Sequence, residues 1–593
     1  TAKDEGRYQI ELGTKGNNLS ASVKKQIEDC NLTGIEFVES NSRYYPLGGF
    51  CSYVVGYAKS YNDQSVKKMV GEMGLELSYD KQLKGKNGYK VYQTDANGYA
   101  LVDGTLREKD PTNGNDLYLT IDSGLQRNLD YLMSNAYSES GAEVVTAGVM
   151  EIKTGKILAM STYPSFNPNE RNISTFNNYF LEGTIECGSV FKPFIYADSI
   201  EEGKYDHNAY YNSGSYNVYY GNKLVATIKD HNGGQGWGTI TYDQGLYHSS
   251  NVAICNLLDQ GYVTKDVLTE KLNDLGFFQG DTMDGLTCSS SINAYTRKNA
   301  GRLEYLTTGF GQGSTVTPYQ LLKAYSVFGN DGKTVQPHIV DKVVNPVTNK
   351  VVYQATPKYS KQIFSTNTIS QVKDLMLGVI EDEQGTGKIY RLDNDVRMIG
   401  KTGTGQVVEN GGYSTTLYMH SFVGIAPYDD PQVVMFLTFK SGDSYAQYMP
   451  NIVKQTMNEA LQVVNRYNAK NTTAVDQSCT LDSYTNQSVN YVKSKLESKS
   501  LSVQIIGNGS SVIEQYPLAK SKVTSGDKVF IKTEGKDITL PNLIGWSKKE
   551  VQTYASLAGI QLTIDGTSGH VTAQSVGENT VVHSGDSLTV AIS

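Results

Sequence analysis

Strand-length apolar runs, separated by turn-forming residues, mark two hairpins at opposite ends of a long central segment. Lys153-Thr154-Gly155 closes the first hairpin and Asp430-Pro431 closes the second. Apolar residues at helical spacing precede and separate the hairpins, as in residues 123–135. Hairpins at both ends with helices between them predict an antiparallel sheet covered by helices. The expected strands lie at 117–121, 145–151, 156–161, 421–425 and 432–439.

The C-terminal part contains two copies of one pattern, offset by 59 residues without a gap. Each copy has one helical pattern, at 488–496 and 547–557, followed by short alternating strand patterns. The chain therefore ends in two small α+β modules. The matched pairs are Leu481 and Leu540, Ser488 and Ser547, Val492 and Val551, Gly507 and Gly566, and Gln515 and Gln574.

Two polar stretches divide the chain into domains. Residues 109–116 are turn-rich, because Pro111 has no backbone N–H to donate and Asn113-Gly114 favours a positive φ. Residues 468–478 are rich in Asn, Thr and Ser and lack apolar periodicity. We therefore predict a multidomain α+β protein. Its expected parts are an N-terminal domain at 1–115, a main domain at 116–467, a linker at 468–479, and modules at 480–535 and 536–593.

Composition narrows the possible partners and cofactors. The chain has 593 residues, a formal net charge of −8 and no block of Lys or Arg, so we expect no nucleic-acid partner. Its apolar runs are far shorter than the ~20 residues that span a bilayer. The six cysteines form no C-x-x-C pair, which argues against a metal cluster or a dense disulfide scaffold. We expect no cofactor. The chain begins at Thr1 without a signal-type apolar segment, so we expect an upstream segment to be absent from it.

The first candidate for chemistry is Ser189-Val190-Phe191-Lys192, an S-x-x-K element at the start of an expected helix. Pro193 fits a helix only in its first turn, which places Ser189 at the helix start. At this spacing the Lys192 amine shares a face with the Ser189 hydroxyl. A positive helix terminus and neighbouring cations lower a lysine pKa, so Lys192 is a candidate general base for Ser189 as nucleophile.

An S-x-x-K element alone is weak evidence for an active site, because the same spacing begins at Ser22, Ser65 and Ser525. Three motifs in a characteristic order are stronger evidence. Ser249-Ser250-Asn251 and Lys401-Thr402-Gly403-Thr404 follow Ser189 in the order that is typical of penicillin-binding proteins and class A β-lactamases.

The K-T-G element also has a second copy, Lys153-Thr154-Gly155. That copy lies between two short strands and is interpreted as a hairpin turn. The copy at Lys401 precedes the strand expected at 415–425, so we expect it to form an edge strand beside the helix that begins at Ser189.

With these motifs the chain resembles the class B penicillin-binding proteins with C-terminal PASTA repeats, of the septal-division type, over nearly its whole length. The resemblance implies a pedestal or dimerisation-like N-terminal domain, a penicillin-binding transpeptidase domain and two PASTA modules. Cys187 departs from the family, in which proline is usual at this point. The stretches that carry the resemblance are 34–37, 43–46, 53–57, 74–85, 122–126, 183–192, 309–313, 385–387, 422–427 and 540–545.

The resemblance implies a role for each motif residue. Ser189 would attack the carbonyl of a D-Ala-D-Ala stem peptide and would be acylated by β-lactams, and Lys192 would take its proton. Ser249 would relay a proton to the leaving D-Ala, and Asn251 would hold Lys192 and the substrate amide. General acid–base steps of this kind contribute roughly 10² to 10⁴-fold.

The same resemblance implies a substrate-binding strand. Lys401 would supply positive potential, Thr404 would bind the terminal carboxylate, and the backbone N–H groups of Ser189 and Thr404 would form an oxyanion hole, each donor worth on the order of 10²-fold or more. The further substrate-binding candidates are Ser250, Thr402, Gly403 and Gln406.

The cellular setting is also implied only by the resemblance. Peptidoglycan stem peptides and β-lactam antibiotics are the expected ligands, with a septal glycosyltransferase and cell-division proteins as partners. The expected location is the extracytoplasmic face of the bacterial membrane, held by an N-terminal anchor that this chain does not contain. Whether the PASTA modules bind peptidoglycan or pack on the catalytic domain stays open.

Three other functions compete with this interpretation. A nucleotide site at Gly385-Thr386-Gly387-Lys388 lacks the earlier glycine of a P-loop, since that position is Asp382. A β-lactamase or β-lactam sensor would share the serine chemistry and would differ in how fast the acyl-enzyme is hydrolysed. A wall-binding scaffold with a decayed site would not be labelled by penicillin at Ser189.

Overall fold

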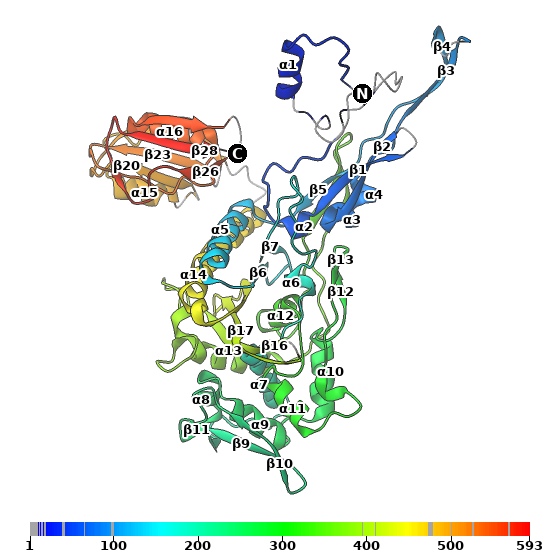
Figure 1. The fold of residues 1–593 in the computed structure, drawn as a ribbon. Coiled ribbons are helices and arrows are strands. Elements are labelled where there is room, and N and C mark those ends of the chain that lie inside the picture. Colours follow the sequence, from blue (N-terminus) through cyan, green and yellow to red (C-terminus); the bar gives the residue numbers. More distant parts are fainter. Residues whose placement is uncertain are drawn as a thin grey trace.

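The computed structural model describes residues 10, 12, 16, 19, 21–37, 42–63, 66–96, 100–393, 395–409, 411–472, 478–497, 499, 501–524, 527–566 and 570–592. They form a central body, from one end of which an N-terminal region of paired strands extends, and the two C-terminal modules lie beside that end (Figure 1). Among these residues, no helix combines the length and the apolar character that crossing a bilayer requires.

The central body contains a five-stranded antiparallel sheet in the order β16-β17-β18-β6-β7. Both predicted hairpins are confirmed, as β6-β7 and β17-β18. Pairing of β18 with β6 joins them, although the two strands are far apart in the sequence. The bounds are β6 (Val144–Glu151), β7 (Ile157–Tyr163), β16 (Ile399–Glu409), β17 (Gly412–Ala426) and β18 (Val433–Ser441).

Helices cover both faces of this sheet, as predicted. On one face α5 (Ser123–Ser140) and α14 (Met449–Thr472) lie side by side and share an apolar core with the strands (Figure 1). The core on the other face includes residues of α7 (Lys192–Glu201), α12 (Pro318–Tyr325) and α13 (Thr366–Glu381). Successive residues Val149 and Met150 of β6 enter the two different cores, as the alternation of a strand requires.

A lobe of shorter elements follows α7 and lies at the lower end of the body in Figure 1. It meets the sheet near the edge strand β16, where the candidate site forms. Its elements are β8 (Tyr210–Asn212), β9 (Ser215–Tyr220), β10 (Lys223–Lys229), β11 (Thr239–Thr241), α8 (Tyr242–Tyr247), α9 (Asn251–Asp259), α10 (Lys265–Asp274) and α11 (Arg302–Gly309). The hairpin of β12 (Asp281–Met283) and β13 (Leu286–Cys288) lies instead against the N-terminal domain, where Ser78 Oγ donates to the Gly285 carbonyl oxygen at 3.0 Å.

The N-terminal domain consists mainly of two hairpins and short helices. The strand β5 (Asp116–Leu119) begins where the main domain was predicted to start, and it pairs with β14 (Val340–Asn345), which also pairs with β15 (Lys350–Gln354). The bounds of the other elements are α1 (Ala21–Asp29), α2 (Ser52–Val55), β1 (Tyr57–Asp63), β2 (Val66–Met73), α3 (Gly74–Ser78), α4 (Asp80–Leu83), β3 (Tyr89–Thr94) and β4 (Ala100–Lys109).

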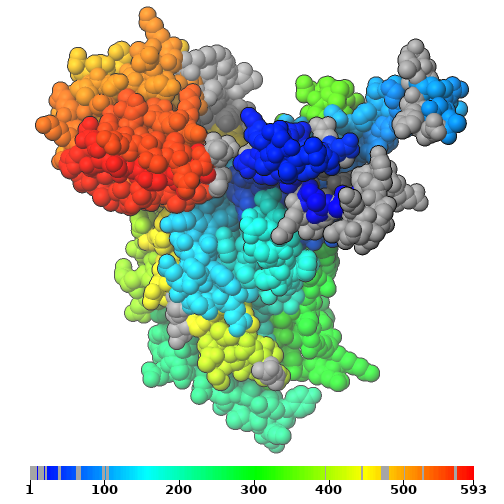
Figure 2. All heavy atoms as spheres, turned by 45° about the horizontal axis from the view of Figure 1, so that its top comes forward, coloured from blue at the N-terminus to red at the C-terminus, as the bar shows by residue number. Residues whose placement is uncertain are grey.

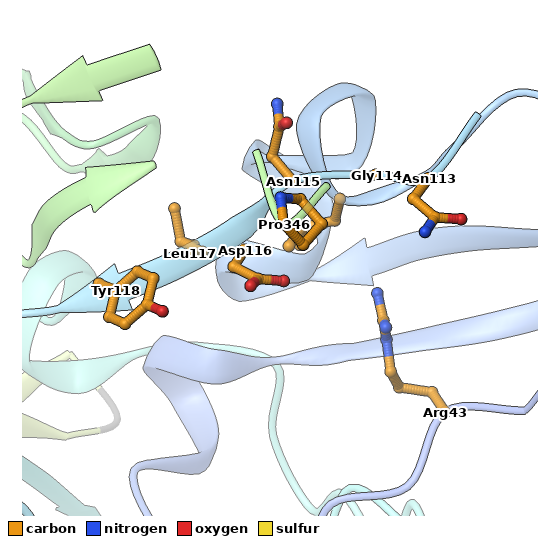
Figure 3. Close-up of a pocket in the computed structure, with 9 residues that line it drawn as sticks. Arg43, Asn113, Gly114, Asn115, Asp116, Leu117, Tyr118 and Pro346 are labelled. Atoms are coloured by element: carbon orange, nitrogen blue, oxygen red, sulfur yellow. The ribbon is translucent and has the colours of Figure 1, made fainter. Parts of the chain in front are cut away.

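A cavity of about 660 Å³ lies at the junction of the N-terminal and main domains, between Arg43, residues 113–118 and Pro346 (Figure 3). None of the predicted catalytic residues lines it. This cavity is therefore separate from the candidate site.

One helix runs further than predicted, and another crosses a predicted domain boundary. α5 continues to Ser140 and ends at Gly141, whose φ of +68° is the left-handed conformation that glycine favours at a helix end. α14 continues to Thr472, so the first residues of the predicted linker are helical. The next part of that stretch, 473–477, lies outside the described residues.

The two C-terminal modules have the same topology, which confirms the predicted repeat. In each, one strand pairs in parallel and one antiparallel with a central strand, in the orders β20-β23-β21 and β25-β28-β26. The bounds are α15 (Val489–Glu497), β20 (Ser502–Ile506), β21 (Val512–Tyr516), β23 (Lys528–Thr533), α16 (Lys548–Ala558), β25 (Gln561–Asp565), β26 (Val571–Gln574) and β28 (Ser587–Ile592).

The two modules share an apolar interface and form one continuous body in the space-filling view (Figure 2). Phe530 of the first module packs on Trp546 and Tyr554 of the second, with ring centroids 5.9 and 6.4 Å apart. Lys528 Nζ lies 3.7 Å from the Trp546 ring centroid, a cation–π contact. Gly545 of the second module lies next to Arg127 of α5, so the second module also touches the central body.

Candidate active site

Ser189 lies on η2 (Gly188–Phe191), a 3₁₀ turn that leads directly into α7. Pro193 occupies the first turn of α7, so the predicted position of Ser189 at a helix start is confirmed, with a tighter opening turn than expected. Val190 and Phe191 are buried, and Phe191 packs on Phe277 with ring centroids 5.1 Å apart. This packing holds the turn while the Ser189 side chain stays partly exposed.

The edge strand β16 packs directly against this turn, because two glycines let the backbones meet. A Cβ atom on Gly405 would lie 1.6 Å from the Glu186 carbonyl oxygen, and one on Gly403 would lie 2.7 Å from that of Cys187. Any side chain at either position would therefore push the strand away from the serine. The predicted placement of the K-T-G element, on an edge strand beside the turn that carries Ser189, is confirmed.

Lys192 is fully buried and directed at the Ser249–Asn251 segment. Its Nζ donates to the Ser249 carbonyl oxygen at 2.6 Å and to Asn251 Oδ1 at 2.8 Å, and Ser249 Oγ lies 3.4 Å away. Burial lowers the pKa of Lys192 to about 7, against the opposing effect of nearby Asp230. A substantial fraction of this amine is therefore neutral near pH 7 and able to accept a proton.

Lys401 reaches the same serine from the opposite side. Its Nζ donates to Ser249 Oγ at 2.8 Å and to the Thr402 carbonyl oxygen at 3.0 Å. Burial and the neighbouring Lys192 hold the pKa of Lys401 well below its usual range. The Ser249 hydroxyl thus lies between the two lysine side chains, and the three motifs predicted from the sequence meet at one point.

Asn251 and Ser250 are held differently. Asn251 Nδ2 donates to the Lys229 carbonyl oxygen at 2.9 Å, which fixes the amide with its oxygen toward Lys192. Ser250 is 1% exposed, and its hydroxyl donates to Asp230 Oδ1 at 2.8 Å and accepts from the Ala253 N–H at 3.0 Å. The structure therefore differs from the expected substrate contact of Ser250, because this side chain points inward and caps α9.

The remaining predicted residues alternate along β16. Lys401, Gly403 and Gly405 are buried, whereas Thr404 is exposed and its neighbours Thr402 and Gln406 are partly exposed on the same face of the strand. Thr402 Oγ1 donates to Thr386 Oγ1 at 2.9 Å. Thr404 and Gln406 are accordingly open to a ligand, while Gly403 contributes close packing.

Motif copies outside the site have other surroundings. Lys153 lies in the β6-β7 turn, where its Nζ donates to the Gly329 carbonyl oxygen at 2.9 Å and its side chain is 49% exposed. Of the other S-x-x-K serines, Ser22 is on α1, and Ser65 and Ser525 lie outside the described residues. The sequence reasoning missed Asp230 and the contact of Thr386, because neither belongs to a spacing rule that connects it to Lys192 or Lys401.

Comparison with known proteins agrees with this geometry. Family profiles described as "Penicillin binding protein transpeptidase domain", "Penicillin-binding Protein dimerisation domain" and "PASTA domain" match residues 145–462, 3–119, and 480–535 with 538–593. Stage V sporulation protein D of Bacillus subtilis is 30% identical over 543 residues, which are 88% of this chain and 80% of that protein. A peptidoglycan D,D-transpeptidase FtsI homolog of Mesostigma viride is 28% identical over 439 residues, 70% of each chain.

Solved structures of penicillin binding proteins are also similar to this chain. The crystal structure of penicillin binding protein 2X from Streptococcus thermophilus aligns with a TM-score of 0.68 and 25% identity, covering 99% of this chain and 89% of that one. Penicillin binding protein 3 from Mycobacterium tuberculosis, complexed with aztreonam, aligns with a TM-score of 0.60 and 24% identity over 72% of this chain and 90% of that one, a similarity of fold.

Proposed function

Because this chain belongs to the penicillin-binding protein transpeptidase family and is a serine-type peptidoglycan D,D-transpeptidase, we propose that Ser189 is its acylated nucleophile and Lys192 the base that activates it. The observation that carries the proposal is the meeting of three motifs at one hydroxyl: both Lys192 and Lys401 lie within hydrogen-bonding distance of Ser249 Oγ. Peptidoglycan peptides are the substrate and β-lactams bind the same family of domains.

In the acylation step, neutral Lys192 takes the proton of Ser189 as the serine oxygen attacks the carbonyl carbon between the two D-Ala residues. The peptide C–N bond then breaks, and the departing D-Ala nitrogen receives a proton that passes from Lys192 through the Ser249 hydroxyl. Asn251 keeps the Lys192 amine aligned during both transfers. The products are an ester on Ser189 and free D-Ala.

In the second step, the amine of another stem peptide attacks the ester carbonyl carbon. The amine loses a proton to Lys192, the ester C–O bond breaks, and Ser189 regains a proton. A new peptide bond replaces the one that was cleaved, and the enzyme returns to its first state. Protons, bonds and charges balance without a metal, a cofactor or an external oxidant.

Substrate binding is assigned to the exposed face of β16. Thr404 contacts the terminal carboxylate, with Thr402 and Gln406 beside it, and the backbone N–H groups of Ser189 and Thr404 stabilise the oxyanion. Burial and the neighbouring Lys192 lower the pKa of Lys401, and a bound substrate carboxylate opposes that shift, because a nearby anion favours the charged form of a lysine.

We also propose a cellular role. Septal wall synthesis on the extracytoplasmic face of the cell membrane, with a glycosyltransferase and division proteins as partners, is supported by the class B resemblance and by the relative named as an FtsI homolog. The β-lactamase and scaffold interpretations lack comparable support, because relatives carry the name D,D-transpeptidase.

Mass spectrometry of the protein after incubation with benzylpenicillin tests the assignment of the nucleophile. We expect one added acyl group per chain, located by peptide mapping on Ser189, and its complete loss in Ser189→Ala, because the ester oxygen is removed. Ser22→Ala, which removes the serine of another S-x-x-K pair, serves as the matched control and should be labelled normally. An adduct on a different residue, or labelling of Ser189→Ala, would show the assignment to be wrong.

A further inference from the structure

Asp230 is a buried carboxylate beside the proposed base, and it lies in none of the three motifs. It directly follows β10, is 1% exposed, and accepts four hydrogen bonds. Oδ2 accepts from the Gly214 N–H at 2.8 Å. Oδ1 accepts from Ser250 Oγ at 2.8 Å, from the Asn251 N–H at 2.8 Å and from the Val252 N–H at 3.1 Å. A carboxylate in such a place is satisfied while charged, because hydrogen bonds compensate for its lost hydration.

These contacts pair the backbone N–H groups at the start of α9. The first two N–H groups of the helix, on Asn251 and Val252, donate to Asp230, and the third, on Ala253, donates to Ser250 Oγ, which itself donates to Asp230. The free N–H groups that every helix start leaves are thereby paired. The negative charge also lies at the positive end of the helix dipole, where it is favoured.

The segment held in this way carries the residues that contact Lys192. The Lys229 carbonyl oxygen, next to Asp230, accepts from the Asn251 side chain at 2.9 Å. Ser249, just before the capped turn, has a φ of +58°, which a non-glycine residue adopts rarely and keeps only when its surroundings enforce it. In that conformation both its carbonyl oxygen and its hydroxyl face Lys192.

We propose that Asp230 is a positioning residue for the transfer reaction, which fixes the Ser249–Asn251 turn around Lys192 and supplies the negative charge that balances this buried amine. The inference rests on the proposed function, in which Lys192 is the base. Asp230 touches neither the substrate nor the reacting atoms. It acts by holding the Ser249–Asn251 turn and by the electrostatic effect of its carboxylate on Lys192.

The charge of Asp230 has a measurable consequence. Burial favours neutral Lys192, and the Asp230 carboxylate opposes that effect. Removing the charge should therefore lower the pKa of Lys192, whereas a residue that only supports the helix would leave it unchanged. The other titratable groups that act on this pair from neighbouring elements are Lys401 on β16, Cys255 on α9, Tyr196 on α7, Tyr211 on β8, and His231 and His248 in the adjoining turns.

The test is the pH profile of Ser189 acylation by benzylpenicillin in Asp230→Asn, measured as a second-order rate constant. We expect the plateau rate to fall by about 10 to 100-fold, because the turn loses its strongest acceptor. We also expect the inflection to move to lower pH by on the order of one unit, as removal of a nearby opposite charge does. An unchanged inflection with a normal plateau would overturn the proposal, and a lower plateau alone would reduce Asp230 to a structural cap.

Asp281→Asn is the matched control, because Asp281 also accepts from buried partners, Tyr319 at 2.7 Å and Lys323 at 2.8 Å, outside the site. It should lower the melting temperature without moving the inflection. Ser250→Ala removes one donor to Asp230 and keeps the charge, so it should lower the plateau and leave the inflection in place.

If Asp230→Asn does not fold, the Ser250→Ala variant tests the positioning role instead. An unchanged plateau rate of acylation in Ser250→Ala would overturn that role. Failure of the proposed function looks different from failure of this inference. Wild-type protein without an adduct on Ser189 contradicts the function itself. Wild type that acylates normally beside an Asp230→Asn variant with the same profile contradicts only the role of Asp230.

Discussion

Replacing Lys192 by methionine is expected to lower the second-order rate constant for acylation by benzylpenicillin about 10³-fold, within the range that a positioned general base contributes. The amine is fully buried, and its hydrogen bonds go to Ser249 and Asn251. Methionine therefore keeps a similar volume but loses the proton acceptor together with these hydrogen bonds. Stopped-flow measurement with a fluorescent penicillin gives the rate constant, and circular dichroism on heating checks that the variant is folded.

Lys323→Met is the control for this result. Lys323 is also largely buried in the catalytic domain, but it pairs with Asp281 instead of a motif residue. Its variant should lose some stability and acylate at the normal rate. If Lys192→Met retained wild-type acylation while folded, another group would have to deprotonate Ser189, and the role of Lys192 would be abandoned.

The second large effect is expected at Lys401, and the chain contains its own control. Lys401→Met should reduce acylation about 10²-fold or more, because it removes the donor that holds Ser249 Oγ and the positive charge that meets the substrate carboxylate. Lys153→Met changes the other K-T-G element, whose lysine lies in a hairpin turn and contacts the Gly329 carbonyl oxygen. That variant should acylate normally.

The same pair of variants should differ in how they bind a peptide that ends in D-Ala-D-Ala. Lys401→Met is expected to weaken inhibition of acylation by the peptide, and Lys153→Met is expected to leave it unchanged. Equal losses in both variants would mean that the two K-T-G copies are not distinguished by their positions in the fold, and the assignment of β16 as the substrate strand would fail.

Local sequence patterns were sufficient for much of the architecture. The hairpins β6-β7 and β17-β18 follow from apolar runs around turn residues, and the helix start at Ser189 follows from Pro193. The repeat of 59 residues was visible because one module is copied without a gap. These features depend on residues that are close together in the chain, so they can be predicted from a single sequence.

The features that were missed depend on contacts between distant segments. Pairing of β18 with β6 joins residues from opposite ends of the domain, and no local pattern specifies it. Asp230 reaches the site because β10 ends beside the start of α9, which no motif spacing indicates. Ser250 was expected to face the substrate, but a serine before a helix also serves as its cap, and the structure uses it in that way.

Burial makes Lys192 neutral enough to accept the Ser189 proton, and the pH dependence of acylation by the wild-type protein is the sharpest test of this role. Below the pKa of Lys192 the second-order rate constant should rise about tenfold per pH unit, because only the neutral amine reacts. We expect this rise to end in a plateau above about pH 7. A rate constant that keeps rising toward the ordinary lysine value of about 10.4, or one that does not change across the neutral range, would contradict it.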